Sequence, residues 1–377
     1  MEFSAIAGGL LRIDLDALVA NYHVLQRQVG GARVAGVIKA DAYGLGAAPV
    51  AQALAEAGCD QFFVAQLKEA IALRQTLRGG AALYVLNGLQ PGAEAAAVAA
   101  DAIPVLNSLD QIERWAMRAA REGRRLRAAL QVDSGMQRMG LSGAELERLL
   151  AEPSRLDGID LGLVMSHLAC ADQPEAEANR AQAERFVALA RHFPGVPRSL
   201  DNSGGAFHPR DHFDIVRAGI ALYGGAPHEG RPNPMRRVVA LDARILQVRE
   251  VPAGTGIGYG LSSVSDRPRR IAAIGVGYAD GWPRHLGNRG AAFIDGRRAP
   301  IAGRVSMDSI TLDVTGVPEA LLNPGALVEL LGPHQTIDDV ARDAGTIPYE
   351  ILTQLGHRYA RTYLPVRTDA DRRSLTA

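Results

Sequence analysis

The sequence is organised around one stretch, Arg33-Val34-Ala35-Gly36-Val37-Ile38-Lys39-Ala40-Asp41-Ala42-Tyr43-Gly44. Residues 34–38 are apolar and rich in β-branched side chains, which is typical of a strand buried on both faces of a parallel sheet. Lys39 stands where this strand ends, and burial lowers the pKa of an amine because it disfavours the charged form. A partly neutral amine is a nucleophile that can form a Schiff base with a carbonyl. The stretch therefore indicates a reactive lysine, with one alternative still open: a lysine that only leaves the strand into solvent.

Composition narrows the class of protein. The chain has 377 residues, 47% of them hydrophobic, which suits two domains or one barrel with an addition. Lys+Arg and Asp+Glu both total 41, so nothing indicates a nucleic-acid or membrane partner. Residues 1–11 lack the features of a signal peptide, and no apolar run is long enough to span a bilayer. Cys59 and Cys170 are far apart, which argues for a reducing compartment and against a disulfide or zinc framework. We therefore expect a soluble cytoplasmic protein without a metal site.

Strand-like and helix-like segments alternate through the first part of the chain. Strands are expected at residues 34–38, 61–65, 82–86, 103–106, 128–132, 161–165, 198–200 and 215–217, and helices lie between them, for example at 67–77, 109–122, 144–151 and 175–192. Eight strands separated by helices predict an α/β fold, an N-terminal (β/α)₈ TIM barrel over residues 12–231. The alternative is an open doubly wound sheet, which would normally show a Gly-rich first turn that residues 39–43 lack.

The pattern changes near Arg231-Pro232-Asn233-Pro234, whose prolines and asparagine mark a linker. Beyond it, short strands are expected at residues 238–248, 271–275, 292–294, 309–314 and 327–330, and helices only near 337–342 and 349–355. Asp295-Gly296 lies between two apolar runs and predicts a hairpin. Residues 232–377 are therefore expected to form a mostly β C-terminal domain, which a strand within residues 1–14 could join.

Polar side chains follow several barrel strands, at the end of the barrel where active sites lie. The strand ends are Lys39, Asp133-Ser134-Gly135-Met136-Gln137-Arg138, Ser166-His167, Asp201-Asn202-Ser203-Gly204-Gly205 and Arg217-Ala218-Gly219-Ile220. A single histidine would more often be a satisfied core residue. Five such ends on one rim indicate a functional site.

The last two barrel strands indicate a phosphate site. Loops there commonly bind phosphate through backbone N–H groups; Ser203 adds a hydroxyl, and Gly219 allows close approach of the backbone. The alternative for residues 202–205 is a simple turn. A reactive lysine, a phosphate cradle and an arginine, Arg217, placed to face a pyridine nitrogen together indicate pyridoxal 5′-phosphate. Arginine cannot readily give that nitrogen a proton, and the weakened electron sink suits proton removal and return rather than transamination.

The chain resembles the alanine racemases, fold-type III pyridoxal-phosphate enzymes, along nearly its whole length. Five segments carry the resemblance, in the family's order: Val37-Ile38-Lys39-Ala40-Asp41-Ala42-Tyr43-Gly44, Asp133-Ser134-Gly135-Met136-Gln137-Arg138-Met139-Gly140, Val216-Arg217-Ala218-Gly219-Ile220-Ala221-Leu222-Tyr223-Gly224, Gly277-Tyr278-Ala279-Asp280-Gly281 and Pro348-Tyr349-Glu350-Ile351-Leu352. Jointly these segments are highly specific, whereas Lys39 alone would be a weak indication.

The resemblance implies an interconversion of L- and D-alanine that supplies D-alanine for peptidoglycan. It implies that Lys39 holds the cofactor and takes the Cα proton from the D-enantiomer, while Tyr278 of the partner subunit in a homodimer takes it from the L-enantiomer. It implies further contacts of three kinds: with the cofactor from Tyr43, Ser203, Arg217, Gly219, Ile220 and Tyr349; with the substrate carboxylate from Arg138 and, in trans, Met307; and with Tyr278 and Arg217 from His167.

Two positions depart from the family pattern. Gln131 stands where many members have a carbamylated lysine that braces the arginine corresponding to Arg138, and Ser306 stands where a cysteine is frequent. A glutamine amide cannot be carbamylated, so Arg138 needs another support. Three other functions are open: a racemase of broader scope acting on serine or other amino acids, a fold-type III decarboxylase, and a non-catalytic pyridoxal-phosphate carrier. The segment around Tyr278 argues against the decarboxylase, and the predicted β domain argues against the carrier.

Overall fold

The computed structural model describes residues 3–77 and 80–366. The chain forms two compact units. The barrel unit comprises the described part of residues 19–222, with 226–235, and the β unit comprises the described part of 1–18, 223–225 and 236–377. The domain boundary between residues 231 and 232 stays a prediction. None of the helices in the described ranges is long and apolar enough to cross a membrane.

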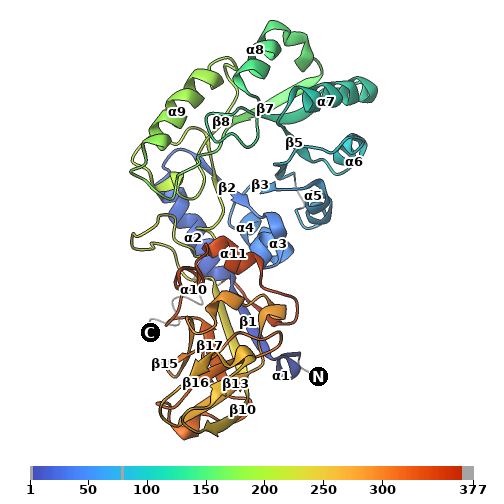
Figure 1. Ribbon diagram of the computed structural model, residues 1–377. Helices are drawn as coiled ribbons and strands as arrows, with labels where there is room; N and C mark the ends of the chain where they lie inside the picture. Colours follow the sequence, from blue (N-terminus) through green and yellow to red (C-terminus); the bar gives the residue numbers. More distant parts are fainter. Residues whose placement is uncertain (1–2, 78–79, 367–377) are drawn as a thin grey trace, which may run out of the picture. The chain divides into compact units, whose positions relative to one another are not determined.

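The barrel unit is built on eight strands in the order β8-β7-β6-β5-β4-β3-β2-β9, each parallel to its paired neighbour. They are β2 (Arg33–Val37), β3 (Gln61–Val64), β4 (Ala82–Val85), β5 (Ile103–Leu106), β6 (Leu126–Gln131), β7 (Ile159–Met165), β8 (Arg198–Ser199) and β9 (Ile215–Ala218). Figure 1 shows β2, β3, β5, β7 and β8 along one curved sheet with helices outside it. The predicted (β/α)₈ barrel is confirmed.

Hydrogen bonds outside a regular ladder close the barrel between β8 and β9. The Ser199 hydroxyl donates to the Ile215 carbonyl at 2.6 Å, and the Arg217 N–H donates to the Asp201 carbonyl at 2.9 Å. β8 is only two residues long, so these contacts take the place of a longer strand pairing. They also fix the ends of the two strands from which a phosphate site was predicted.

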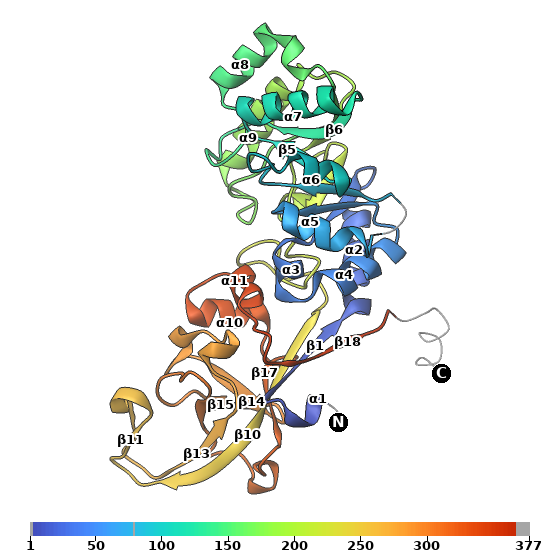
Figure 2. The same cartoon turned by 90° about the vertical axis from the view of Figure 1, so that its right-hand side faces the viewer.

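Helices cover the outside of the barrel. They are α2 (Leu15–Gln28), α4 (Ala47–Glu56), α5 (Leu67–Arg74), α6 (Glu94–Ala99), α7 (Leu109–Glu122), α8 (Gly143–Ala151) and α9 (Glu177–Ala190). The unit also contains α3 (Lys39–Gly44), whose backbone is left-handed, and the 3₁₀ turns η1 (Pro153–Leu156) and η2 (Gly205–Phe207). Figure 2 shows α5, α6 and α7 following one another in chain order. The sequence sets the limits of α7: Ser108 caps its start, and Gly123 ends it in a left-handed conformation. Trp115, within this helix, is buried.

The barrel core explains why the strands read as continuous apolar runs. All four residues of β3 and all four of β5 are buried, including Phe62 and Phe63. Each fully buried side chain of this size stabilises the fold by about 1.5–3 kcal/mol relative to its exposed state. Burial on both faces is expected for parallel strands covered by helices. The helices therefore hold the carboxyl ends of the strands in fixed positions at one rim.

The β unit is a mostly antiparallel sheet, in agreement with the predicted fold class. Its long strand β10 (Val239–Val251) pairs with β1 (Gly9–Asp14), β13 (Arg269–Ile274) and β17 (Leu327–Leu331); β1 and β10 run beside each other in Figure 2. The other elements are α1 (Phe3–Ile6), β11 (Gly256–Ile257), η3 (Tyr259–Leu261), β12 (Ser263–Val264), η4 (Tyr278–Asp280), η5 (Arg284–Leu286), β14 (Ala291–Ile294), β15 (Arg297–Pro300), β16 (Ile310–Asp313), η6 (Glu319–Leu321), α10 (Ile337–Ala344), α11 (Pro348–Thr353) and β18 (Ala360–Leu364).

Two local predictions for this unit are confirmed. Asp295 and Gly296 have φ values of 49° and 72° and join β14 to β15, as a tight hairpin requires. The N-terminal strand β1 pairs antiparallel with β10 and parallel with β18. The first strand of the chain is thus part of the C-terminal sheet.

Candidate active site

Lys39 begins a turn with an unusual backbone. Ala40, Asp41, Ala42 and Tyr43 all have φ between 52° and 57°, so four consecutive non-glycine residues are left-handed. Such a conformation costs roughly 1–2 kcal/mol per residue, so neighbouring contacts must stabilise the turn. One of them is the Asp41 carboxylate, which accepts from the N–H of Ala47 at 2.7 Å. The sequence analysis did not predict the left-handed conformation of these residues.

The surroundings of Lys39 favour a reactive amine. Burial lowers its pKa, the nearby guanidinium groups of Arg138 and Arg217 lower it further, and the Glu69 carboxylate opposes them. The direction of this shift is the one that the sequence predicts for a buried lysine. An amine with a lowered pKa is more often neutral and more nucleophilic at neutral pH.

Arg217 lies in the wall of the site on β9, with only 2% of its surface exposed. Its Nη1 donates to the Ser199 hydroxyl at 2.6 Å, and its Nη2 donates to the carbonyl of Ser166 at 2.6 Å and to Nδ1 of His167 at 2.9 Å. Burial lowers the pKa of Arg217 to about 10. The guanidinium therefore stays protonated at neutral pH, and these acceptors fix its plane.

His167 accepts a hydrogen bond from Arg217. An arginine can only donate, so Nδ1 of His167 accepts in this contact, while Nε2 lies 3.4 Å from the side-chain amide nitrogen of Asn202. Burial and the charges of Arg217, Arg138 and Lys39 hold the pKa of His167 well below its ordinary value. The histidine is thus a neutral, oriented partner of Arg217. Gln182 of α9 fixes the backbone by donating to the His167 carbonyl at 3.0 Å.

Ser203, Gly219 and Tyr43 form a small cradle at the ends of β8, β9 and β2. The Ser203 hydroxyl accepts from the N–H groups of Gly219 and Ala221, at 2.8 and 3.2 Å. A Cβ on Gly219 would overlap the hydroxyl oxygen of Tyr43, so this position needs glycine. Ile220 is buried beside it. A glycine backbone beside a phenol and a hydroxyl leaves room for a phosphate group, and this fits the phosphate of pyridoxal phosphate.

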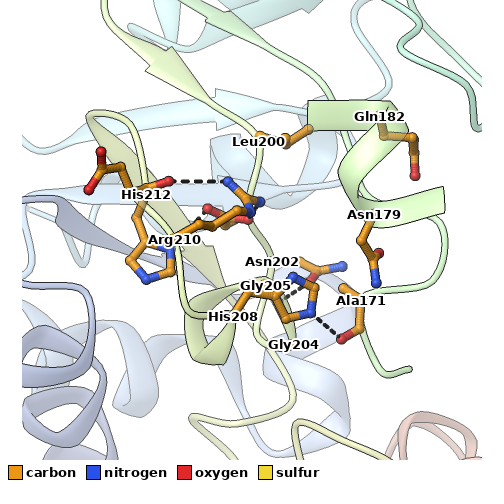
Figure 3. Close-up of polar contacts among 12 residues, drawn as sticks. Ala171, Asn179, Gln182, Leu200, Asn202, Gly204, Gly205, His208, Arg210 and His212 are labelled. Atoms are coloured by element: carbon orange, nitrogen blue, oxygen red, sulfur yellow. Dashed lines mark hydrogen bonds and ion pairs between the residues drawn. The ribbon is translucent and has the colours of Figure 1, made fainter. Parts of the chain in front are cut away.

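A buried ionic cluster is centred on Asp201, two residues before Ser203 in the chain. The fully buried carboxylate of Asp201 pairs with Arg210 and with Nδ1 of His212. Figure 3 shows His208 from the same segment against Ala171, where its Nε2 lies 3.1 Å from the carbonyl oxygen. The sequence analysis marked Asp201 as a polar strand end, and in the structure its carboxylate pairs with Arg210 and His212 of the segment that follows.

Arg138 extends from a loop whose shape is set by two other side chains. The Asp133 Oδ1 accepts from the N–H groups of Gly135, Met136 and Gln137 at 2.8–3.2 Å. Gln131 is buried and donates from Nε2 to the carbonyl of Met139 at 3.2 Å. Arg138 itself is exposed. The position that departs from the family pattern thus contacts the residue beside Arg138.

In the β unit, Tyr278 and Met307 lie on two turns that are joined through their backbones. The N–H of Tyr278 donates to the Ser306 carbonyl at 3.0 Å, and the N–H of Ala279 donates to the Met307 carbonyl at 2.9 Å. A Cβ on Gly277 would overlap the same carbonyl. The two predicted residues are therefore fixed relative to each other.

Arg358 ties the same two turns together through their carboxylates. Its Nε lies 3.1 Å from the Asp280 Oδ1, and its Nη1 lies 2.7 Å from the Asp308 Oδ1. Asp280 is buried and also accepts from the N–H of Gly277 at 2.9 Å. The sequence did not mark Arg358, whose partners are distant in the chain and leave no local pattern.

The three predicted residues of the β unit are exposed in the single chain. The exposed fractions are 42% for Tyr278, 53% for Met307 and 39% for Tyr349 at the start of α11. Tyrosine and methionine are usually more buried than this. Their roles stay predictions.

The chain matches two family models, "Alanine racemase, N-terminal domain" over residues 13–227 and "Alanine racemase, C-terminal domain" over residues 238–363. Among curated proteins it is 54% identical to a catabolic alanine racemase of Agrobacterium fabrum, over 95% of this chain and 92% of that protein. It is 52% identical to an alanine racemase of Brucella canis, over 97% and 96% of the two chains.

Solved structures agree in fold. The alanine racemase of Bartonella henselae, with covalently bound pyridoxal phosphate, superposes with a TM-score of 0.92 at 41% identity, over 95% of this chain and 100% of that one. An alanine racemase of Streptomyces coelicolor gives a TM-score of 0.90 at 33% identity, over 96% and 99% of the two chains.

Proposed function

This chain belongs to the alanine racemase family, and we propose that it interconverts L-alanine and D-alanine with two bases, Lys39 and Tyr278. It is an amino-acid racemase, and its cofactor is pyridoxal 5′-phosphate. The observation that carries the proposal is the group of an amine with a lowered pKa, a protonated arginine and a glycine cradle at one rim of the barrel. We also propose residues 12–231 as the cofactor domain and 232–377 as the domain of the second base.

Residues of the barrel unit, with Tyr349 of the β unit, would hold the cofactor at both of its ends. Lys39 would bind it covalently, Arg217 would face its ring nitrogen, and Tyr43, Ser203, Gly219, Ile220 and Tyr349 would bind its phosphate. When bound, the cofactor supplies an electron sink that makes the Cα proton of an amino acid acidic. Arg217 keeps its own proton at neutral pH, so it would limit that sink and favour return of the proton to Cα.

Each base would serve one face of the substrate. Lys39 would accept the Cα proton of D-alanine, and Tyr278 would accept that of L-alanine. A phenol, with an ordinary pKa near 10, acts as a base when cations stabilise the phenolate, which we assign to Arg217 acting through His167. Arg138 and the backbone of Met307 would bind the substrate carboxylate.

We propose a two-fold homodimer in which Tyr278 and Met307 act on the partner's Lys39. The exposure of both side chains in the single chain supports this arrangement. In a symmetric dimer, each site would then contain one base from each subunit.

In the cell we propose a cytoplasmic enzyme that supplies D-alanine for peptidoglycan. A second role, alanine breakdown, is favoured by the catabolic alanine racemases among its relatives. Deleting the coding sequence distinguishes them: loss of the biosynthetic enzyme creates a D-alanine requirement, whereas loss of the catabolic one impairs growth on alanine as carbon source.

The activity test uses the purified protein with L- or D-alanine and chiral chromatography of the product. Both enantiomers should approach an equal mixture, and Lys39→Ala should abolish the conversion together with the cofactor absorbance that survives dialysis. Serine, tested in parallel, measures the breadth of the substrate range. A decarboxylated product, or no conversion by the cofactor-loaded protein, would rule the proposal out.

A further inference from the structure

The carboxylate of Glu69 joins two elements of the barrel unit. Its Oε2 accepts from the N–H groups of Ala65 and Gln66, at 2.8 and 2.9 Å, where α5 begins. Its Oε1 accepts from the N–H of Ala40 at 2.5 Å. Ala40 is the first left-handed residue after Lys39. One side chain thus connects the start of α5 to the start of the Lys39 turn.

The contact with Ala40 goes beyond capping a helix. α8 begins with a capping box of the same kind, in which Glu145 accepts from the N–H and hydroxyl of Ser142. Glu69 makes the equivalent contact with its own N-cap residue and in addition reaches a residue 29 positions earlier. Both glutamates therefore cap a helix, but of the two only Glu69 also bonds to the backbone of the Lys39 turn.

Glu69 is also the acidic group among the charges around Lys39. Arg138 faces the amine from the loop after β6, Arg217 from β9, and the neutral His167 from the loop after β7. Burial lowers the pKa of the Lys39 amine, Arg138 and Arg217 lower it as well, and Glu69 raises it. A group that takes up and returns a proton works best with a pKa near the working pH. Without Glu69, nothing among these four neighbours would limit the depression.

We propose that Glu69 is a positioning residue for Lys39: its carboxylate accepts from the N–H of Ala40 and from the start of α5, fixes the backbone that follows the lysine and places a negative charge at the start of the Lys39 turn. The inference rests on the proposed role of Lys39 as a base. Glu69 contacts the Lys39 turn and α5, and it acts through them rather than on the substrate.

The sequence provides a direct probe of Lys39. Lys39 and Lys68 are the two lysines of the 377-residue chain. Lys68 is exposed and its peptide can be scored separately. Trace acylation of the full-length chain freed of cofactor, followed by mass spectrometry of the two peptides, gives the acylation rate of each amine at every pH. An added reference amine normalises the rates.

The variants separate charge from geometry. Glu69→Gln removes the charge but keeps an oxygen that can accept from Ala40, whereas Glu69→Ala removes both. Only the neutral amine is acylated, so loss of the negative charge should move the acylation curve of Lys39 to lower pH in both variants. Hydrogen exchange at the Ala40 amide should quicken strongly in Glu69→Ala and less in Glu69→Gln. Glu145→Gln, which breaks the matched capping box on α8, should change neither readout.

The holoenzyme supplies the functional readout. Racemisation should fall on the order of ten- to a hundredfold in Glu69→Ala, the loss expected when a reacting group is misplaced, while Glu145→Gln stays near the parent. Glu69→Asp, which keeps the charge, should stay closer to the parent pH profile than Glu69→Gln does.

Two outcomes overturn the inference: an acylation curve of Lys39 that does not move in Glu69→Gln, or one that moves equally in Glu145→Gln. The acylation assay does not depend on racemisation. If the curve moves as expected but Lys39→Ala still racemises alanine, the proposed base is wrong and the coupling between Glu69 and Lys39 stands.

Discussion

The Lys39 turn of the barrel unit and the Tyr278 turn of the β unit both follow a buried strand and both present a proposed base, but they are built differently. The Lys39 turn runs through four left-handed residues that are not glycine, and it is stabilised by its own Asp41 carboxylate and by Glu69 from another helix. The Tyr278 turn uses Gly277 and Gly281 where its backbone needs them and carries its own carboxylate, Asp280.

The difference matters for the chemistry that each turn can perform alone. Lys39 is half-buried among charges that lower its pKa within its own unit. Tyr278 is 42% exposed. The barrel turn thus holds its proposed base where burial and nearby charges already lower the pKa of the amine, whereas the proposed base of the β-unit turn is exposed in the single chain. We infer that the environment of Lys39 is complete once the chain has folded, whereas that of Tyr278 is completed when two subunits assemble.

The largest effect should come from separating the two turns between subunits. Lys39→Ala and Tyr278→Phe homodimers should each be nearly inactive, because each lacks one base at every site. Random reassociation of the two should recover roughly a quarter of the parent activity, since half of the dimers would then contain one complete site out of two. Lys68→Ala, a matched lysine variant, should remain active.

Subunit exchange has to be confirmed by native mass spectrometry in the same mixture. If exchange is complete and no activity returns, the two bases act within one chain or Tyr278 is not the second base. The environment of Tyr278 would then not depend on dimer assembly, and the proposed difference from Lys39 would be wrong.

A large effect is also expected when the cradle beside the Lys39 turn is filled. Gly219→Ala places a methyl group against the Tyr43 hydroxyl, and overpacking of this kind costs about 1–3 kcal/mol, which corresponds to about a five- to 150-fold loss in cofactor affinity. A titration of the protein with pyridoxal phosphate, followed by absorbance, measures this loss of affinity. Adding Tyr43→Phe should restore part of the loss. Gly162→Ala on β7, where a Cβ has ordinary space, should bind as the parent does.

If the Gly219→Ala, Tyr43→Phe double variant bound pyridoxal phosphate as weakly as Gly219→Ala alone, the clash would not be with the Tyr43 hydroxyl. Tyr43 would then need another place in the site, and the Lys39 turn would be separate from the cradle.

The contrast between the turns also explains what could be predicted from the sequence. The turn around Tyr278 can be predicted from the sequence Gly277-Tyr278-Ala279-Asp280-Gly281, because glycine and aspartate are typical of turns. The residues from Ala40 to Tyr43 do not predict a left-handed backbone, since alanine and tyrosine rarely adopt that conformation. The handedness comes from tertiary contacts that no local pattern encodes.

The same distinction holds for the fold and the site. Buried strands such as β3 and β5 were predicted because burial on both faces leaves a clear apolar run. The two-residue strands β11 and β12 and the strand β18 were missed, because they are short or leave no continuous apolar face. Strand-end reasoning found Arg217 and Ser203 but missed Arg358, which depends on distant partners; the capping box at Gln66 could have pointed to Glu69.

A smaller effect is expected at the support of the Tyr278 turn. Arg358→Met leaves the buried carboxylate of Asp280 without its guanidinium partner and frees Asp308 on the neighbouring turn. Racemisation should fall about tenfold because the second base is less well positioned, while cofactor absorbance stays at the parent level because the barrel is untouched. Arg342→Met, which breaks exposed ion pairs on α10, should have little effect.

If Arg358→Met instead reduced cofactor absorbance as strongly as racemisation, Arg358 would stabilise the protein as a whole. The Tyr278 turn would then not be an independently supported element, and the comparison with the Lys39 turn would lose its basis.

The smallest effect concerns Gln131, near the Lys39 side of the site. Its amide donates to Met139 beside Arg138, and an amide cannot form a carbamate with carbon dioxide. Removing dissolved carbon dioxide at mildly acidic pH should therefore leave racemisation unchanged at matched pH and ionic strength. Gln131→Ala should raise the KM for alanine about fivefold, the loss expected from one hydrogen bond of about 1 kcal/mol, with kcat nearly unchanged. A reversible loss restored by bicarbonate would contradict this account, because it would require a carbamate on another amine.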